Sequence, residues 1–341
     1  MSFFYTAETA RRLADPTCLP GEAPTYDWSF TSVKRLQFDT MLVNASVMTH
    51  DREDIRVQAY GECSGLSADL RKGVLQLNAP LPFKLGKTQR PLQLLRRWLE
   101  LEASMTTLTS GSSSSRHFRV NGREIDLRQA LQLVIWMPAL TPMTVARPYG
   151  AIGIGCQMGN LHVVSSMELA VFATQVHRLT GAIGASSSVE VGGVTGGVEL
   201  ETNLSSKLTT GDVAGNVKLE LGSSTQAALG QIGGDLRLTS GLGGNVKAQS
   251  VAGDIHVEGT STEVTIASGV SGKLSADLSI DCKLIHAGRV TEISRLDLSP
   301  GATAVINGRR YTWSPFGNDN APRAPRPPRP PRPPRPPRMP W

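Results

Sequence analysis

The sequence contains few aromatic residues, few cysteines and no long apolar run. Aromatics make up 5% of its 341 residues, and the cysteines number four. No apolar stretch approaches the roughly 18 residues of a membrane-spanning helix. The first 16 residues also lack the basic cap and apolar core of a secretory signal. Four distant cysteines without a Cys-x-x-Cys pair are typical of reduced thiols rather than of disulfides or a zinc site. We therefore expect a cytoplasmic protein.

The positive charge of the chain is confined to its C-terminus. The formal net charge is +6, but six arginines and no acid lie between residues 321 and 341. Subtracting them leaves 35 − 6 = 29 bases against 29 acids in residues 1–320. The sequence thus predicts a neutral body with a basic tail, and the overall charge does not indicate a basic groove on the body. The tail arginines are Arg323, Arg326, Arg329, Arg332, Arg335 and Arg338.

A 19-residue repeat organises the second half of the chain. One column of the repeat is always glycine: Gly196, Gly215, Gly234, Gly253 and Gly272. Aliphatic columns lie two residues before it, two after it and four after it. They are Val194, Val213, Ile232, Val251 and Val270, then Val198, Val217, Leu236, Ile255 and Leu274, and finally Leu200, Leu219, Leu238, Val257 and Ala276. Outside these five units the phase weakens, since His177 and Thr291 stand at the glycine position.

This repeat predicts a single-stranded β-solenoid. Alternation of apolar and polar residues, as in Val217-Lys218-Leu219, indicates short strands with one buried face. A unit this short cannot bury its apolar edge alone, so its copies must stack, with strands about 4.8 Å apart. We interpret the glycine column as a corner with positive φ. The glycine content and the lack of long helical stripes argue against a helical repeat.

The rest of the chain suggests a mainly β protein with one small α/β insertion. We expect an N-terminal segment (1–30), an N-terminal β region (31–87), an α/β insertion or cap (88–140), the β-solenoid (141–315) and a Pro/Arg-rich disordered tail (316–341). Within the insertion, residues 91–105 have helical spacing, residues 118–125 resemble a hairpin with an Asn-Gly turn, and residues 126–133 are predicted as a short helix. A second Asn-Gly turn is predicted at Asn307-Gly308.

The chain resembles bacterial adhesin-like β-solenoid domains of unassigned function. The resemblance covers most of residues 30–300. It depends on the opening β segment at 38–79, on the extended Pro142-Met143-Thr144-Val145 and on Gly-Asp-Val/Ile coils such as Gly253-Asp254-Ile255. These motifs imply a fold and no activity. The coils are also similar to those of bactofilins, cytoskeletal solenoids with proline-rich tails, from which this chain departs in its long N-terminal region.

None of the sequence motifs for cofactor binding or nucleophilic catalysis is complete in this chain. Gly86-Lys87-Thr88 resembles the end of a P-loop, but Leu81 stands where the first glycine is required. The glycines at 153, 155 and 159 have the wrong spacing for a dinucleotide site, and no Gly-x-Ser-x-Gly elbow occurs. Cys282 and His286 lie four residues apart without a second pair to complete a zinc site. We predict no cofactor, no metal and no catalytic residue.

One polar column of the repeat allows two interpretations. Asn216, Asp235 and Asp254 occupy successive units, preceded by Gly197 and followed by Lys273. Asn and Asp tolerate tight corners and form local hydrogen bonds, so the column suits a structural corner. Stacked acids could also bind a cation or perform acid–base catalysis, as in carbohydrate-active β-helix enzymes.

The tail has a regular pattern of its own. Arg-Pro-Pro repeats as a strict triplet up to Arg338. Polyproline II has three residues per turn and rises about 3.1 Å per residue, so these arginines would lie along one edge about 9 Å apart. Such an edge suits an anionic polymer or an acidic membrane surface. The Pro-x-x-Pro-x-Arg pattern ending at Arg335 also suits an SH3-like domain, and a solubilising spacer is the plain alternative.

These observations favour a non-enzymatic scaffold or interaction protein in which a β-solenoid presents the arginine tail to a partner. Two alternatives stay open. One is a carbohydrate-active enzyme that uses Asp235 and Asp254, and the other is a bactofilin-like filament or homo-oligomer formed through uncapped solenoid ends.

Overall fold

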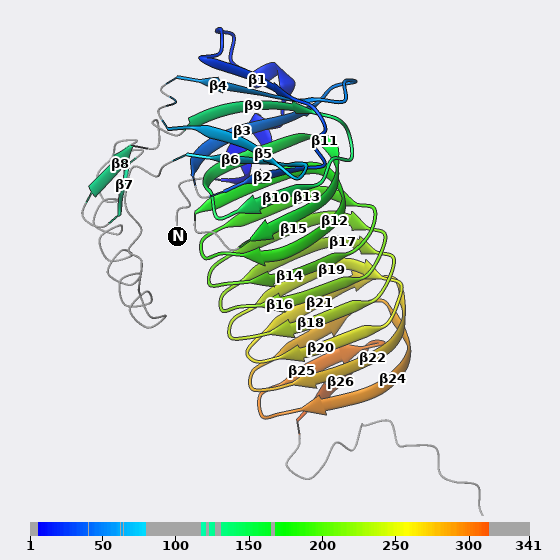
Figure 1. Cartoon of the computed structure of the whole chain (residues 1–341). Helices are drawn as coiled ribbons and strands as arrows, with labels where there is room; N and C mark the ends of the chain where they lie inside the picture. Colours follow the sequence, from blue (N-terminus) through cyan, green and yellow to red (C-terminus); the bar gives the residue numbers. More distant parts are fainter. Residues whose placement is uncertain are drawn as a thin grey trace, which may run out of the picture.

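The structure, a computed structural model, is an elongated stack of β coils (Figure 1). It describes residues 6–39, 41–61, 63, 65–79, 117–120, 123–126, 131–164 and 168–313. Helix α1 (Ala7–Leu13) and a 3₁₀ turn (Pro16–Cys18) are the helical elements of this described part. The fold is mainly β and is the predicted β-solenoid. Among the residues described, no helix has the length and apolar character needed to span a bilayer.

Ten strands form the first part of the molecule. They are β1 (Tyr26–Phe30), β2 (Arg35–Phe38), β3 (Leu42–Thr49), β4 (Ile55–Tyr60), β5 (Ser67–Arg71), β6 (Val74–Asn78), β7 (His117–Val120), β8 (Arg123–Asp126), β9 (Leu131–Met137) and β10 (Met143–Ala146). Most are short, and several have neighbours in the sheet that are not their neighbours along the chain, since β2 lies between β6 and β10 and β9 lies between β3 and β4.

The remaining strands form the solenoid proper. Two long strands, β11 (Tyr149–Val164) and β12 (Leu169–Ile183), come first. The odd-numbered strands that follow line one face of the tube: β13 (Ser188–Val194), β15 (Lys207–Val213), β17 (Gln226–Ile232), β19 (Asn245–Val251), β21 (Glu263–Ser268), β23 (Lys283–His286) and β25 (Thr303–Ile306). The even-numbered strands line the other: β14 (Val198–Thr202), β16 (Val217–Leu221), β18 (Leu236–Ser240), β20 (Ile255–Gly259), β22 (Val270–Leu278) and β24 (Arg289–Leu298), and β26 (Arg309–Thr312) ends the fold.

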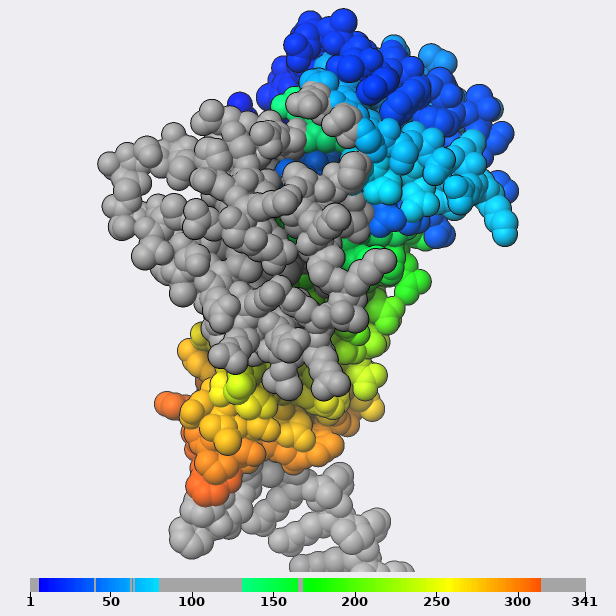
Figure 2. Space-filling model, turned by 60° about the vertical axis from the view of Figure 1, so that its left-hand side comes forward, coloured from blue at the N-terminus to red at the C-terminus, as the bar shows by residue number. Residues whose placement is uncertain are grey.

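The 19-residue period of the sequence equals the offset between paired residues on successive coils. β14, β16 and β18 pair in parallel, so Val198, Val217 and Leu236 are direct neighbours on successive coils. These residues and their counterparts on the odd-numbered strands point inward and are almost completely buried. Because each coil of the solenoid lies directly on the previous one, its colours run in successive bands from green through yellow to orange (Figure 2).

The glycine column is confirmed, but its predicted cause is wrong. The Gly196 amide donates to the His177 carbonyl at 2.7 Å, and the amide of each later glycine donates to the carbonyl of the glycine one coil earlier, from Gly215 to Gly196 at 2.8 Å through Gly272 to Gly253 at 3.0 Å. None of the five has positive φ. The left-handed positions of these coils lie in the other turn, at residues such as Ser205 and Ser224. Glycine is required in this column by close packing between coils, as described below for its neighbours.

One member of the aliphatic columns is misplaced in the prediction. Val270 is 61% exposed, whereas the adjacent Ser271 is buried and occupies the inward position. The Ser271 hydroxyl donates to the Val251 carbonyl at 2.8 Å. Ser250 pairs with Ser268, 18 residues later, whereas the Gly272 amide bonds the Gly253 carbonyl, 19 residues earlier, so one extra residue lies between Ser268 and Gly272 and turns Val270 outward. The other columns are buried as predicted.

The N-terminal β region continues the same stack and closes its end. β2 and β3 pair in parallel with β10 and β11, and β6 and β9 pair in parallel with β2 and β3. Antiparallel strands then terminate the two faces, with β5 on β6, β4 on β9 and β1 on β4. These antiparallel strands cover the edges that a further parallel coil would occupy.

One element expected within the insertion, the hairpin, is present. β7 and β8 form an antiparallel hairpin in which Val120 pairs with Arg123, as the Asn-Gly turn predicts. The predicted helix at 91–105 lies outside the described residues. The helix predicted at 126–133 is wrong at its C-terminal end, because residues 131–133 begin strand β9, which pairs with both β3 and β4. Alternating burial at Leu131, Leu133 and Ile135 fits a strand and was overlooked.

Helix α1 was not predicted, although it explains two glycines of β11. A Cβ atom on Gly153 would lie 2.3 Å from the Ala10 carbonyl oxygen, and one on Gly155 would lie 2.2 Å from the Ala14 oxygen. These glycines let the helix rest directly on the strand. Arg11 forms an ion pair with Glu190 of β13 and helps to fix the helix to the solenoid. Thr6, which caps the helix, was the signal in the sequence.

The C-terminal end is closed on one face. β26 pairs antiparallel with β25 through the predicted Asn-Gly turn, in which Asn307 and Gly308 both have positive φ. The Asn307 amide side chain also bonds the backbone of Val290 in β24. On the other face, β24 pairs with β22 and has no further neighbour among the described strands.

Candidate functional site

In the polar column beside the glycines, the side chain of one coil accepts a hydrogen bond from a backbone amide of the next coil, and we call this series the ladder. Asn216 Oδ1 accepts from the Asp235 amide at 2.9 Å, Asp235 Oδ1 from the Asp254 amide at 2.9 Å, and Asp254 Oδ1 from the Lys273 amide at 2.7 Å. Each side chain thus satisfies an amide of the next coil at a corner where the backbone leaves the strand pattern. The structural interpretation of this column accounts for its residue types.

The same contacts limit what the column can do chemically. One carboxylate oxygen of Asp235 and one of Asp254 are already committed to the backbone. The side chain of Lys273 pairs with Glu292, at 3.5 Å, rather than with these acids. Among the residues that the structure describes, no group of three or more His, Cys, Asp or Glu could hold a metal ion. The corner therefore carries no recognisable cation site in the described part of the chain.

The even-numbered strands present two columns of charged side chains to solvent. We call the first the acidic lane: it contains five carboxylates with one threonine between them. The second, the mixed lane, runs parallel to it along the same strands. The acidic lane is Glu201, Glu220, Thr239, Glu258, Asp277 and Asp297, and the mixed lane is Glu199, Lys218, Arg237, His256, Ser275 and Arg295. Together they hold six carboxylates and three Lys or Arg, so the face is net negative.

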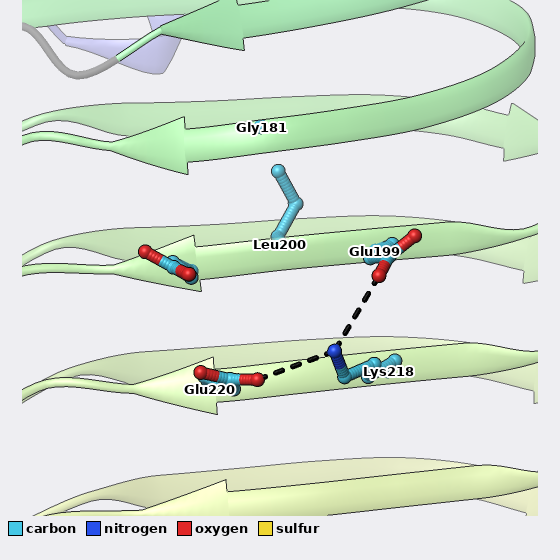
Figure 3. A pocket seen from close by; sticks show the side chains of 6 residues that line it. Gly181, Glu199, Leu200, Lys218 and Glu220 are labelled. Carbon is cyan, nitrogen blue, oxygen red and sulfur yellow. Dashed lines mark hydrogen bonds and ion pairs between the residues drawn. The ribbon is translucent and has the colours of Figure 1, made fainter.

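Ion pairs connect the two lanes. Lys218 Nζ lies 3.4 Å from Glu199 Oε1 and 3.3 Å from Glu220 Oε1, and Figure 3 shows it reaching toward both. Arg295 binds Asp297 at 2.6 Å and Asp277 at 3.4 Å. These partners raise the pKa of Lys218 and of Arg295, chiefly through hydrogen bonds to Glu220 and Asp297. All of these side chains are about half exposed, so each pair contributes little to stability.

The charged face has a shallow hollow at its upper end. A cavity of about 200 Å³ is lined by Gly181, Glu199, Leu200, Glu201, Lys218 and Glu220 (Figure 3). Gly181 has φ of 120° and a Cβ there would lie 1.9 Å from the Val163 carbonyl oxygen. Glycine is therefore required at this position, because a side chain would collide with the backbone of the preceding coil. The walls of the hollow are carboxylates and an ammonium group without a nucleophile or an adjacent base.

A second depression lies at the glycine corner between the two faces. It has a volume of about 440 Å³ and is lined by small and polar residues. Asp212 is one of them, and its Oδ1 accepts from the Gln231 amide at 2.9 Å. The lining residues are Gln175, Gly192, Gly193, Val194, Thr195, Asp212, Val213, Ala214, Gln231 and Gly233. The groove contains no aromatic side chain on which a sugar ring could stack.

The cysteines are free thiols, as predicted. Cys63, Cys156 and Cys282 are buried, and Cys18 is exposed. Burial raises the pKa of Cys156 to about 11, so the thiol stays protonated and unreactive at neutral pH. Cys282 and His286, which share the spacing of a metal-ligand pair, are both core residues. The His286 ring bonds Ser271 at 2.9 Å and belongs to the interior packing.

The sequence predicted the repeat, but the acidic lane was not among the predicted site residues. The lane alternates with the buried columns, so each of its positions follows the last aliphatic residue of a repeat by one. Reading the polar residues at the same 19-residue period would have found Glu201, Glu220 and Glu258. The tail arginines at 323, 326, 329, 332, 335 and 338 and the P-loop-like Gly86-Lys87-Thr88 lie outside the described residues.

Comparisons with known proteins find distant structural similarity and no match in sequence. No family model matches the chain, and no curated protein matches it. A "putative adhesin" from Parabacteroides distasonis has a TM-score of 0.41 and 10% identity, covering 83% of this chain and 98% of its own. Another from Parabacteroides merdae has a TM-score of 0.38 and 9% identity, covering 82% and 94%. Both share the description that the sequence resemblance predicts, and neither determines a function for this chain. The resemblance to bactofilins stays a prediction.

Proposed function

We propose that this chain is a non-enzymatic interaction protein whose β-solenoid body carries an arginine–proline tail to an anionic polymer or surface. The observation that carries the proposal is the separation of charge: residues 1–320 contain equal numbers of acids and bases, and the last 21 residues contain six arginines without an acid. Charge held at a fixed period on a stiff segment binds phosphate-rich polymers with a small entropic cost.

The hydrogen bonds made by polar side chains of the body support this proposal. Asp235 and Asp254, the residues of the enzymatic alternative, each accept a backbone amide of the next coil. The first depression is lined by no hydroxyl or thiol group, and in the second the Thr195 hydroxyl is hydrogen-bonded to the His177 ring at 3.1 Å, on the exposed outer surface of the coil. A rigid stack of coils serves instead as a platform that holds the tail at one end.

The test is binding of the full chain to polyphosphate, to duplex DNA and to vesicles with anionic lipid, each at several salt concentrations. Wild-type affinity should fall steeply with salt, and each Arg→Gln change in the tail should reduce the salt slope by about one. Arg→Lys changes at the same positions preserve charge and should retain most of the binding. Equal affinity of the six-Gln variant and the wild type would refute the proposal.

A matched pair of variants separates charge from proline recognition. Pro330→Ala with Pro333→Ala disrupts all three Pro-x-x-Pro-x-Arg matches of the tail, at residues 327–332, 330–335 and 333–338, and leaves every arginine in place. Binding to anionic polymers should survive these changes, whereas docking to an SH3-like groove would be lost.

A further inference from the structure

The acidic lane matches the period of the tail. Parallel coils are about 4.8 Å apart, so lane positions two coils apart are separated by about 9.6 Å. A polyproline II segment brings every third residue to the same edge after about 9.3 Å. Asp297, Glu258 and Glu220 are spaced by two coils each along the lane. Three successive tail arginines therefore span about the same 19 Å as these three carboxylates.

Each of the three carboxylates uses only one of its two oxygens in an ion pair with a described residue. Asp297 uses Oδ2 for Arg295, Glu258 uses Oε1 for His256, and Glu220 uses Oε1 for Lys218. The second oxygen of each makes no hydrogen bond to a described residue. A guanidinium can bind that oxygen without first breaking the existing pair, because a carboxylate accepts several hydrogen bonds.

The described chain ends beside the lane. β24 ends at Leu298, one residue after Asp297, and a four-residue turn leads to Thr303 at the start of β25. Thr303 pairs with Thr312, the last residue of β26. The chain after Trp313 thus starts near the Asp297 end of the lane. Ten residue steps separate Trp313 from Arg323, which reach up to about 33 Å when extended.

From this match we propose that the tail docks on the acidic lane of its own chain, with three of its arginines on Asp297, Glu258 and Glu220. The contact goes beyond the proposed function, because it requires no external polymer. Attachment to the same chain gives the tail a millimolar effective concentration at the lane, which favours docking within one chain over docking between chains. An anionic polymer would compete with the lane for the same arginines.

The test places one spin label beside the lane and one on the tail of the full chain. Cys18→Ser removes the exposed native thiol, and Leu242→Cys and Met339→Cys provide the labels. Leu242 is 59% exposed in the turn after β18. At low salt, double electron–electron resonance should show a narrow distance distribution, which should become broad in 1 M salt as the ion pairs are screened.

Variants identify the docking surface. Asp297→Asn with Glu258→Gln and Glu220→Gln should abolish the narrow distribution. Asp51→Asn with Glu53→Gln and Asp69→Asn removes the same charge from exposed positions at the other end of the molecule and should preserve it. A narrow distribution that persists in the lane variant, or disappears in the control variant, overturns the proposal. Loss of the narrow distribution after a tenfold excess of unlabelled chain is added would show docking between chains and would also overturn it.

Discussion

Asp254 Oδ1 lies 2.3 Å from the point where a Cβ atom on Gly272 would stand. The same oxygen accepts the Lys273 amide at 2.7 Å. The carboxylate of one coil thus occupies the space above the glycine of the next, and the two columns of the repeat depend on each other. Asn216 over Gly234 and Asp235 over Gly253 repeat the relationship, at 2.1 Å and 2.3 Å.

Gly272→Ala should therefore destabilise the protein by about 1–3 kcal/mol, because the added methyl group displaces the Asp254 side chain and its hydrogen bond. At Gly272 the carboxylate oxygen is the one atom closer than 3.4 Å. Asp254→Ala alone should cost about 1 kcal/mol. The double variant should cost less than the sum, and denaturant unfolding of all four proteins measures the coupling.

Gly193→Ala is the matched control for this cycle. A Cβ on Gly193 would find its nearest neighbour, the Asp212 carbonyl oxygen, at 3.9 Å, which is ordinary contact. This variant should unfold at nearly the wild-type denaturant concentration. Additive costs for Gly272→Ala and Asp254→Ala would contradict the steric explanation of the glycine column.

The ladder also predicts that its negative charge is dispensable. Asp235→Asn with Asp254→Asn should keep the wild-type stability or raise it by a few tenths of a kcal/mol, since Asn216 already makes the same bond and stacked like charges repel. Thermal and denaturant unfolding provide the measurement, with Asp235→Ala and Asp254→Ala as the destabilised reference. A loss as large as that of the alanine variants would show that the carboxylates have a role of their own.

The sequence predicted those features that the 19-residue period repeats. Because stacking copies one coil onto the next, a residue such as Leu219 has the same surroundings as Leu200 and Leu238, and its burial follows from the pattern. The outward position of Val270 was not predicted, because one extra residue between Ser268 and Gly272 changes which side chain points inward while the coil as a whole keeps the 19-residue period. Helix α1 and strand β1 were not predicted because they occur once, so no second copy signals them. The glycine column was found with the wrong cause, since close approach between coils depends on neighbours 19 residues away.

His286 should make stability depend on pH. It is fully buried, and burial lowers its pKa below the ordinary 6.5. Since the Ser271 hydroxyl donates to Val251, His286 Nε2 must donate to Ser271, and this leaves Nδ1 buried without a described partner. The unfolded chain then takes up the proton at a higher pH than the folded chain. Stability is complete above pH 6.5 and falls below it, by at most about 1.4 kcal/mol per pH unit.

Denaturant unfolding at several pH values between 7.5 and 5 tests this expectation. The difference between the wild type and His286→Gln isolates the contribution of this ring from those of the other titrating groups. The Gln variant should be less stable at pH 7.5, and its disadvantage should shrink as the pH falls. A constant difference between the two proteins over this range would contradict the assignment.

The charged side chains on the free edge of β24 should keep molecules from stacking end to end. Strand β24 has one neighbour among the described strands, yet it carries Arg289, Glu292, Arg295 and Asp297 along ten residues. Charged side chains on an edge strand oppose pairing with another copy. Glu292→Val with Arg295→Val should therefore produce dimers or longer species in sedimentation velocity, whereas Lys218→Val with Arg237→Val should not, because β16 and β18 are paired on both sides. Filaments of the wild-type chain under the same conditions would show that charge does not protect this edge, and they would favour self-assembly through the solenoid ends.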